Sequence, residues 1–179
     1  MNQISYSLSD DDIRNYLDDQ IKVIPYSDIQ RYTNTRHGIY QLLEPFGRIV
    51  ILYKTNGDGF QSSGHWCCLF RNRQRHEIEF FDSYGMLPDD QLEQGDELKN
   101  FAGQNHYYLT RLLADASEKI IYNHFKLQRY APNINTCGRW CLLRLLNGDL
   151  SLEEFKKLLD ANKSKGISYD QLVTKLISF

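Results

Sequence analysis

The 179-residue sequence has no long apolar run, no basic leader and no strong excess of charge of either sign. Because nothing in it is long and apolar enough to span a bilayer or to act as a secretory signal, we expect an intracellular, soluble protein without a membrane partner. Its formal net charge is −2, so no global positive field attracts nucleic acid. The short basic stretch 71–76 is interpreted as a solvated turn.

Cysteine is scarce as well, with four residues in the chain. Their spacing does not suggest a disulfide framework, and free thiols are expected inside a cell. A chain of this length buries enough apolar surface to fold as one unit. We predict a single domain over residues 1–179, with a core at about 48–147, a helical N-terminal segment at 1–47 and accessory C-terminal helices at 151–179.

Hydrophobic periodicity in the central part of the chain predicts a small sheet. Residues 48–53 have the composition of a buried strand, and two further strands flank the basic turn as a hairpin. An amphipathic pattern predicts a helix later in the core, followed by another strand. The predicted ranges are 65–70 and 77–81 for the hairpin, 100–116 for the helix and 119–128 for the last strand.

Helix-start signals occur at both ends of the chain. Ser9 precedes three aspartates and a helical apolar pattern, and a strongly apolar run over 137–146 ends at Asn147-Gly148. Capping boxes begin two more helices, at Ser151 and at Ser168. The sequence therefore predicts an α+β fold, a small central mixed β-sheet flanked by helices.

Cys137 is the best candidate for a nucleophile. The residues from Pro132 to Thr136 favour a loop and those that follow favour a helix, which places the thiol at a helix N-terminus. Unpaired N–H groups and the helix dipole there stabilise a thiolate and an oxyanion, and Gly138 leaves the backbone open beside the sulfur. A buried structural cysteine is the alternative, which Cys141 fits well.

His65 and Asp82 have contexts that suit a base and its orienting carboxylate. His65 follows a polar loop and begins a strand, so its ring can lie at the edge of a cleft. Asp82 closes a buried strand, from which it can bond the far nitrogen of the imidazole. Taken singly, His65 is better explained as an ordinary histidine, and a turn-capping role is a good explanation of Asp82.

Two further roles are assigned less directly. Gln128 precedes the nucleophile by nine positions and can donate its amide to the oxyanion, although Asn133 and Asn135 are nearer to Cys137 in sequence. Arg129 is too long and too charged to be preferred. Trp66 faces away from His65 if the segment is extended, where it packs in the core or lines a substrate groove.

A zinc site is the main alternative chemistry, because histidine and cysteine are zinc ligands. No CxxC pair is present, and Cys67 and Cys68, which are adjacent in a strand, face opposite sides. We therefore predict no metal and no cofactor. The residues considered for zinc were His65, Cys67, Cys68, Cys137 and Cys141.

Together these motifs resemble the clan of cysteine proteases that includes adenovirus protease and the SUMO-specific Ulp1/SENP proteases. The order His–Asp–Cys is that of the clan and the opposite of papain-like enzymes. Cys-Gly-Arg-Trp and the small size look most like capsid-maturation proteases of virophages, Polinton-type elements and large DNA viruses. The resemblance spans roughly residues 60–147, and it rests on Gly64-His65-Trp66, Phe81-Asp82-Ser83, Gln128 and Cys137-Gly138.

The resemblance implies a cysteine endopeptidase that cuts after glycine or alanine in capsid or other virion precursors, with the nucleophile at the N-terminus of a buried helix. It implies a location in the host cytoplasm, virus factory or virion. It leaves a peptide activator open, whereas the net charge argues against dependence on DNA. The implied roles are nucleophile Cys137, base His65, orienting Asp82, oxyanion donor Gln128, and substrate contacts at Gly64, Trp66 and Gly138.

Two other functions are compatible with these residues. A protease that removes ubiquitin or a ubiquitin-like modifier also cuts after small residues, so the active site alone does not separate it from a capsid protease. An inactive protease fold kept as a scaffold or binding module is the second alternative. An unreactive thiol at Cys137 would favour the scaffold.

Overall fold

The computed structural model describes residues 3–54, 64–93, 104 and 106–179. A five-stranded mixed sheet forms its centre, in the order β1-β2-β3-β4-β5. β3 pairs antiparallel with both β2 and β4, while β1 pairs in parallel with β2 at one edge and β5 pairs in parallel with β4 at the other. The strands are β1 (Lys22–Pro25), β2 (Arg48–Lys54), β3 (Gly64–Asn72), β4 (Glu77–Asp82) and β5 (Lys119–Tyr122).

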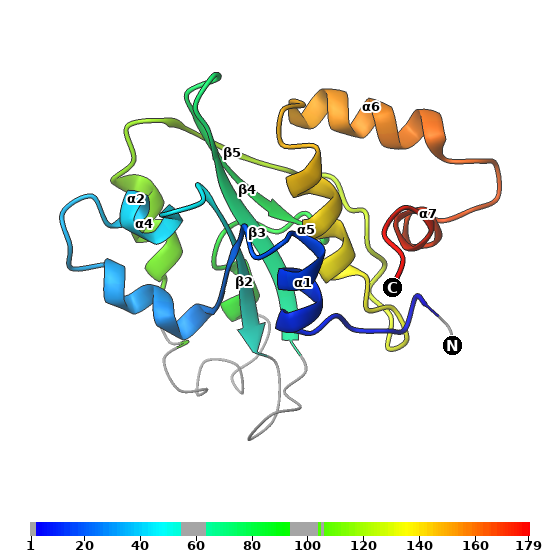
Figure 1. The fold of residues 1–179 in the computed structure, drawn as a ribbon, viewed down its shortest axis with the longest axis horizontal. Coiled ribbons are helices and arrows are strands. Elements are labelled where there is room, and N and C mark those ends of the chain that lie inside the picture. Colours follow the sequence, from blue (N-terminus) through cyan, green and yellow to red (C-terminus); the bar gives the residue numbers. More distant parts are fainter. Residues whose placement is uncertain (1–2, 55–63, 94–103, 105) are drawn as a thin grey trace.

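Helices cover both faces of the sheet (Figure 1). On one face pack α1 (Asp10–Tyr16), α5 (Cys137–Leu146), α6 (Leu152–Asn162) and α7 (Tyr169–Leu176). On the other pack the 3-10 helix η1 (Tyr26–Tyr32), α2 (Gly38–Leu43) and α4 (Tyr108–Ala114), and a second 3-10 helix, η2, spans Asp90–Glu93. This arrangement confirms the predicted α+β class with a mixed sheet between helices.

β3 is the central strand, and its side chains supply both cores. Because successive residues of a strand face opposite sides, Trp66 and Cys68 pack toward α5, whereas Cys67 and Leu69 pack toward α2 and α4. The prediction that Cys67 and Cys68 face opposite sides is confirmed. α5 is buried over nearly its whole surface, so it is the internal helix of the fold.

The helix signals in the sequence are borne out locally. Ser9, Ser151 and Ser168 each form the reciprocal hydrogen bonds of a capping box at the start of α1, α6 and α7. α5 begins at Cys137 and ends at Leu146, with Asn147 as its C-cap.

Three elements differ from the sequence-based expectation. The predicted helical segment 1–47 also contributes β1, a four-residue strand that pairs with β2. The strand predicted over 119–128 ends at Tyr122, because the chain then turns away to form the loop before α5. The helix predicted over 100–116 covers only Tyr108–Ala114 within the described residues, and positions 100–103 and 105 lie outside them.

A buried ion pair joins α5 to β4. Arg144 donates from Nε and Nη2 to the two carboxylate oxygens of Glu79, at 2.7 and 2.8 Å, and both side chains are almost fully buried. We expect Arg144→Ala to lower the free energy of unfolding by about 3–5 kcal/mol, because it leaves a buried carboxylate without its partner. Denaturant unfolding measures this. Lys157→Ala, which removes an exposed pair with Glu153, should leave the midpoint unchanged.

Among the described residues, no helix is long and apolar enough to cross a membrane.

Candidate active site

The sheet brings His65 and Asp82 together at the start of β3. β3 pairs with β4 only from Cys67, which lies opposite Asp82, so Gly64, His65 and Trp66 extend past the end of β4. Side chains two residues apart on a strand share a face, so His65 points to the same side as Cys67. Because Cys67 lies opposite Asp82, the His65 ring is directed toward Asp82. Nε2 of His65 lies 3.0 Å from Oδ1 of Asp82, and both residues are buried.

Asp82 is fixed in place by several donors. Oδ1 also accepts the backbone N–H of Tyr84 at 2.6 Å, and Oδ2 accepts the thiol of Cys67 and the amide of Gln91, each at 3.4 Å. The backbone of Asp82 is held by the Asn123 side chain, which accepts its N–H at 3.0 Å and donates to its carbonyl at 2.7 Å. A carboxylate held this firmly can set the orientation of an imidazole.

Cys137 is the first residue of α5 and contacts the same imidazole. Its side chain lies close enough to His65 to help raise the pKa of the imidazole, and it is 4% exposed. Because Asp82 engages Nε2, Nδ1 is the ring nitrogen left for the thiol. The N-cap residue Thr136 gives no side-chain bond to the helix, since its hydroxyl donates to Asp170 at 2.6 Å instead. The first N–H groups of α5 therefore lack a side-chain cap next to the sulfur.

The electrostatics of this cluster favour a charged imidazole. Burial opposes the charge on His65, but Asp82, Cys67 and Cys137 outweigh burial and raise the pKa of His65 well above its ordinary value. Burial likewise works to raise the pKa of Asp82, yet His65 and the hydrogen bonds to the carboxylate lower it. Both shifts favour the ion pair of imidazolium and carboxylate, an arrangement that suits a neighbouring thiolate.

Gln128 lies close to the site, but its amide is already engaged. Nε2 donates to the carbonyl of Ile134 at 3.0 Å and to the hydroxyl of Tyr84 at 3.1 Å, while Oε1 accepts the Ser83 hydroxyl at 2.8 Å. Neither alternative donor is better placed, since Asn135 donates to the Ser5 carbonyl and Asn133 is exposed.

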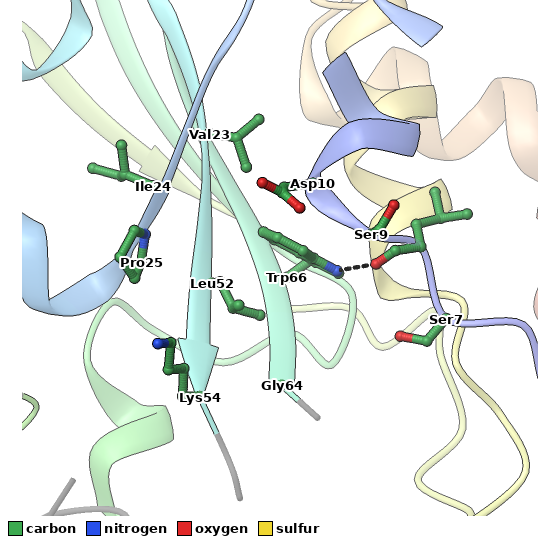
Figure 2. A pocket seen from close by; sticks show the side chains of 11 residues that line it. Ser7, Ser9, Asp10, Val23, Ile24, Pro25, Leu52, Lys54, Gly64 and Trp66 are labelled. Atoms are coloured by element: carbon green, nitrogen blue, oxygen red, sulfur yellow. Dashed lines mark hydrogen bonds between the residues drawn. The ribbon is translucent and has the colours of Figure 1, made fainter. Parts of the chain in front are cut away.

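Next to the site, a cleft of about 520 Å³ opens between the N-terminal segment and the ends of β1, β2 and β3. Figure 2 shows Trp66 forming one wall, with its indole N–H donating to the carbonyl of Leu8 at 3.0 Å. Trp66 thus both packs in the core and lines the cleft. A Cβ on Gly64 would lie 2.4 Å from Leu52 and 2.7 Å from the Tyr53 carbonyl, so only glycine fits there. The polar loop that precedes His65 lies outside the described residues at positions 55–63.

Gly138 has a different local role from the one expected. A Cβ at this position would lie 3.1–3.2 Å from the side chain of Leu8, so the space beside the helix is filled rather than open. The glycine lets the N-terminal segment pack against the start of α5. Leu8 therefore packs against Gly138, the neighbour of Cys137, and also accepts the hydrogen bond from Trp66 in the wall of the cleft.

Comparison with known proteins places the chain. No protein-family model matches it. It is 38% identical over 172 residues to uncharacterized protein V9 of Sputnik virophage, and this alignment covers 95% of the present chain and 93% of V9. The chain belongs to the V9 family. Two crystal structures of the ASFV pS273R protease, one with selenomethionine, are similar to this chain over its whole length, each with a TM-score of 0.50. The match covers 70% of the first protease chain at 16% sequence identity and 71% of the second, selenomethionine chain at 15%.

At this identity the likeness to the ASFV protease is one of fold. This V9-family chain shares the α+β fold of that protease.

The structure of the V9-family chain brings together a different set of possible metal ligands from the one considered for zinc. His65, Cys67 and Asp82 place one ligand atom each within 4.8 Å of one another, a set compact enough for a metal ion. These atoms already bond to one another, and burial raises the pKa of the Cys67 thiol, so that it stays protonated. Cys68 and Cys141 contact each other on the other face of the sheet.

Sequence analysis missed several residues that support the site. Cys67 could have been found from strand alternation and hairpin register, which place it opposite Asp82. Asn123, in the loop after β5, and Gln91, in η2, are brought to Asp82 only by the tertiary fold, so no local pattern indicates them. Tyr84 follows Asp82 by two residues, but its stacking on His65 is visible only in the structure.

Asp170 of α7 braces the loop in front of Cys137. It is fully buried and accepts the Thr136 hydroxyl and the Arg129 backbone N–H, the latter at 3.2 Å. We expect Asp170→Ala to lower the free energy of unfolding by about 1.5–3 kcal/mol, since both donors lose a charged acceptor. Asp170→Asn, which keeps an acceptor oxygen, should cost less. Equal unfolding midpoints for the wild type and Asp170→Ala would contradict this role.

Proposed function

We propose that this protein is a cysteine endopeptidase with Cys137 as nucleophile, His65 as base and Asp82 as orienting carboxylate. The observation that carries the proposal is one buried imidazole that bonds Asp82 through Nε2 and contacts the Cys137 side chain at the start of α5. A nucleophile, a base and a group that orients the base are the parts that covalent peptide hydrolysis requires.

In this mechanism the Cys137 thiolate attacks the carbonyl carbon of the scissile bond. The uncapped N–H groups of α5 stabilise the oxyanion, and His65 gives its proton to the nitrogen as the C–N bond breaks. The first product leaves as an amine and the other half remains as a thioester on Cys137. Water then attacks the thioester while His65 takes up a proton from it, and breaking of the C–S bond releases the carboxylic acid and restores the thiolate–imidazolium pair.

The substrates proposed are virion precursors, including capsid proteins, that carry glycine or alanine before the cut. The cleft beside Trp66 and Gly64 would hold the residues on the N-terminal side of the scissile bond. Cys137 is only 4% exposed, so a small residue is best able to bring its carbonyl to the sulfur. Membership of a family with a virophage protein supports a virion substrate.

The test is a peptide library together with a covalent probe. The wild-type protein is incubated with diverse peptides, and the cut sites are read by mass spectrometry; cuts after glycine or alanine are expected. In parallel, a peptide vinyl sulfone that ends in glycine is added and the modified residue is mapped. Labelling at Cys137, with Cys67, Cys68 and Cys141 unlabelled, is the expected result.

Other outcomes point to the alternatives. Rapid capture of a ubiquitin-like electrophilic probe, with no library cleavage, would favour a protease specific for such a modifier. No cleavage together with an unreactive Cys137 would contradict the enzyme and leave the scaffold. No cleavage with a reactive Cys137 would support a protease that needs an activator.

A further inference from the structure

Tyr84 lies over the imidazole of the proposed site. It follows Asp82 by two residues, and its ring stacks on the His65 ring with a centroid separation of 4.6 Å and an interplanar angle of 21°. The charges of His65 and Cys137 both act on its hydroxyl. The hydroxyl therefore lies near both groups that take part in the proposed reaction.

The hydrogen bonds of Gln128 show how this hydroxyl is oriented. The amide nitrogen has two protons, one donated to the Ile134 carbonyl and the other to the Tyr84 oxygen. Because Tyr84 is the acceptor in this bond, its own proton points elsewhere. No residue among those described accepts that proton, so it remains available to a ligand at the site.

We propose that the Tyr84 hydroxyl is the side-chain donor to the oxyanion, and that Gln128 is a positioning residue acting through it. The inference rests on the proposed protease function and deepens it. If Gln128 donated directly, one of its N–H groups would first have to release the Tyr84 hydroxyl or the Ile134 carbonyl. Donation by Tyr84 keeps both bonds of Gln128, because an N–H of Gln128 holds the phenol oxygen and leaves its proton directed away from the amide.

The environment keeps this hydroxyl protonated. Burial raises the pKa of Tyr84 to about 12, with the charge of Cys137 acting in the same direction and that of His65 against it. The phenol is thus a neutral donor at neutral pH. No bond to hydrogen breaks in this role: the O–H···O⁻ contact forms as the tetrahedral intermediate appears and is lost when it collapses.

Tyr84→Phe tests the proposal, because it keeps the ring on His65 and removes only the hydroxyl. We expect kcat on the best library peptide to fall by about 10²-fold with KM changed less than threefold, as for loss of one oxyanion donor. A peptide aldehyde ending in glycine, whose adduct with Cys137 carries an oxygen at the oxyanion position, should bind about 10-fold or more weakly. Tyr130→Phe is the matched control, since Tyr130 contacts the Tyr84 ring but is 75% exposed.

A double-mutant cycle separates Tyr84 from Gln128. If Gln128 acts through Tyr84, Gln128→Ala should lower kcat in the wild type and have little further effect in Tyr84→Phe. Full additivity, or a Tyr84→Phe enzyme as fast as the wild type or faster, would overturn the proposal; in the second case the hydroxyl only occupies the oxyanion position. Failure of the protease function itself would be seen in the wild type, as neither cleavage nor labelling of Cys137, and would remove this inference with it.

Discussion

Cys137→Ala is expected to abolish peptide cleavage, with kcat lowered by about 10⁶-fold or to below detection, as for other covalent nucleophiles. The thiolate supplies the bond to the acyl group, and alanine has no atom that can replace it. The fold should persist, because the change removes one sulfur atom at the start of α5 and no hydrogen bond that holds α5 in place. The measurement is the rate on the best library peptide, with circular dichroism as the check on folding.

The other cysteines provide the controls for this result. Cys141 lies one turn further along α5 and is 1% exposed, and Cys68 lies beside it on the face of β3 away from His65. Cys141→Ala and Cys68→Ala should therefore keep most of the activity while lowering stability slightly. If a folded Cys141→Ala protein were inactive and Cys137→Ala were active, the assignment of the nucleophile would be wrong.

Local signals in the sequence predicted the parts of the site that depend on local structure. The start of α5 at Cys137 follows from a poor helix-forming segment before an apolar helical run, and the capping boxes fix α6 and α7 through contacts three residues apart. The hairpin also follows from alternation, and its register places Cys67 opposite Asp82. These features were predictable because each is decided by residues close together in the sequence, with Cys67 and Asp82 the furthest apart at 15 positions.

Contacts between distant segments were not predictable in the same way. β1 is four residues long and is stable only because β2 pairs with it, so no pattern in residues 22–25 distinguishes it. The partners of Gln128 depend on how the loop before α5 passes Ser83, whose carbonyl accepts the backbone N–H groups of Leu127 and Gln128. The position of Gln128 in the sequence suggested that it lies near the nucleophile, but only the fold shows that its amide donates to Tyr84.

Asp82→Asn is expected to lower kcat/KM by about 10³–10⁴-fold, as for loss of an orienting carboxylate in a related triad. Asp82 raises the pKa of His65 against the opposing effect of burial. Without the carboxylate the imidazolium should lose its proton at lower pH, so the basic limb of the pH–rate profile should move toward acid. The pH dependence of kcat/KM, measured for both proteins, checks the shift.

The pH dependence of stability gives an independent check on Asp82. Its folded pKa is lowered, so it contributes stability that is present above the unfolded pKa and is lost as the pH falls through the folded value. Asp82→Asn should therefore flatten the acid side of the stability profile. Asp89→Asn is the matched control, because Asp89 is also buried but bonds Tyr26 and Thr110 away from His65, and its pKa is raised by burial. A basic limb that moved in Asp89→Asn and not in Asp82→Asn would show that Asp82 does not tune His65.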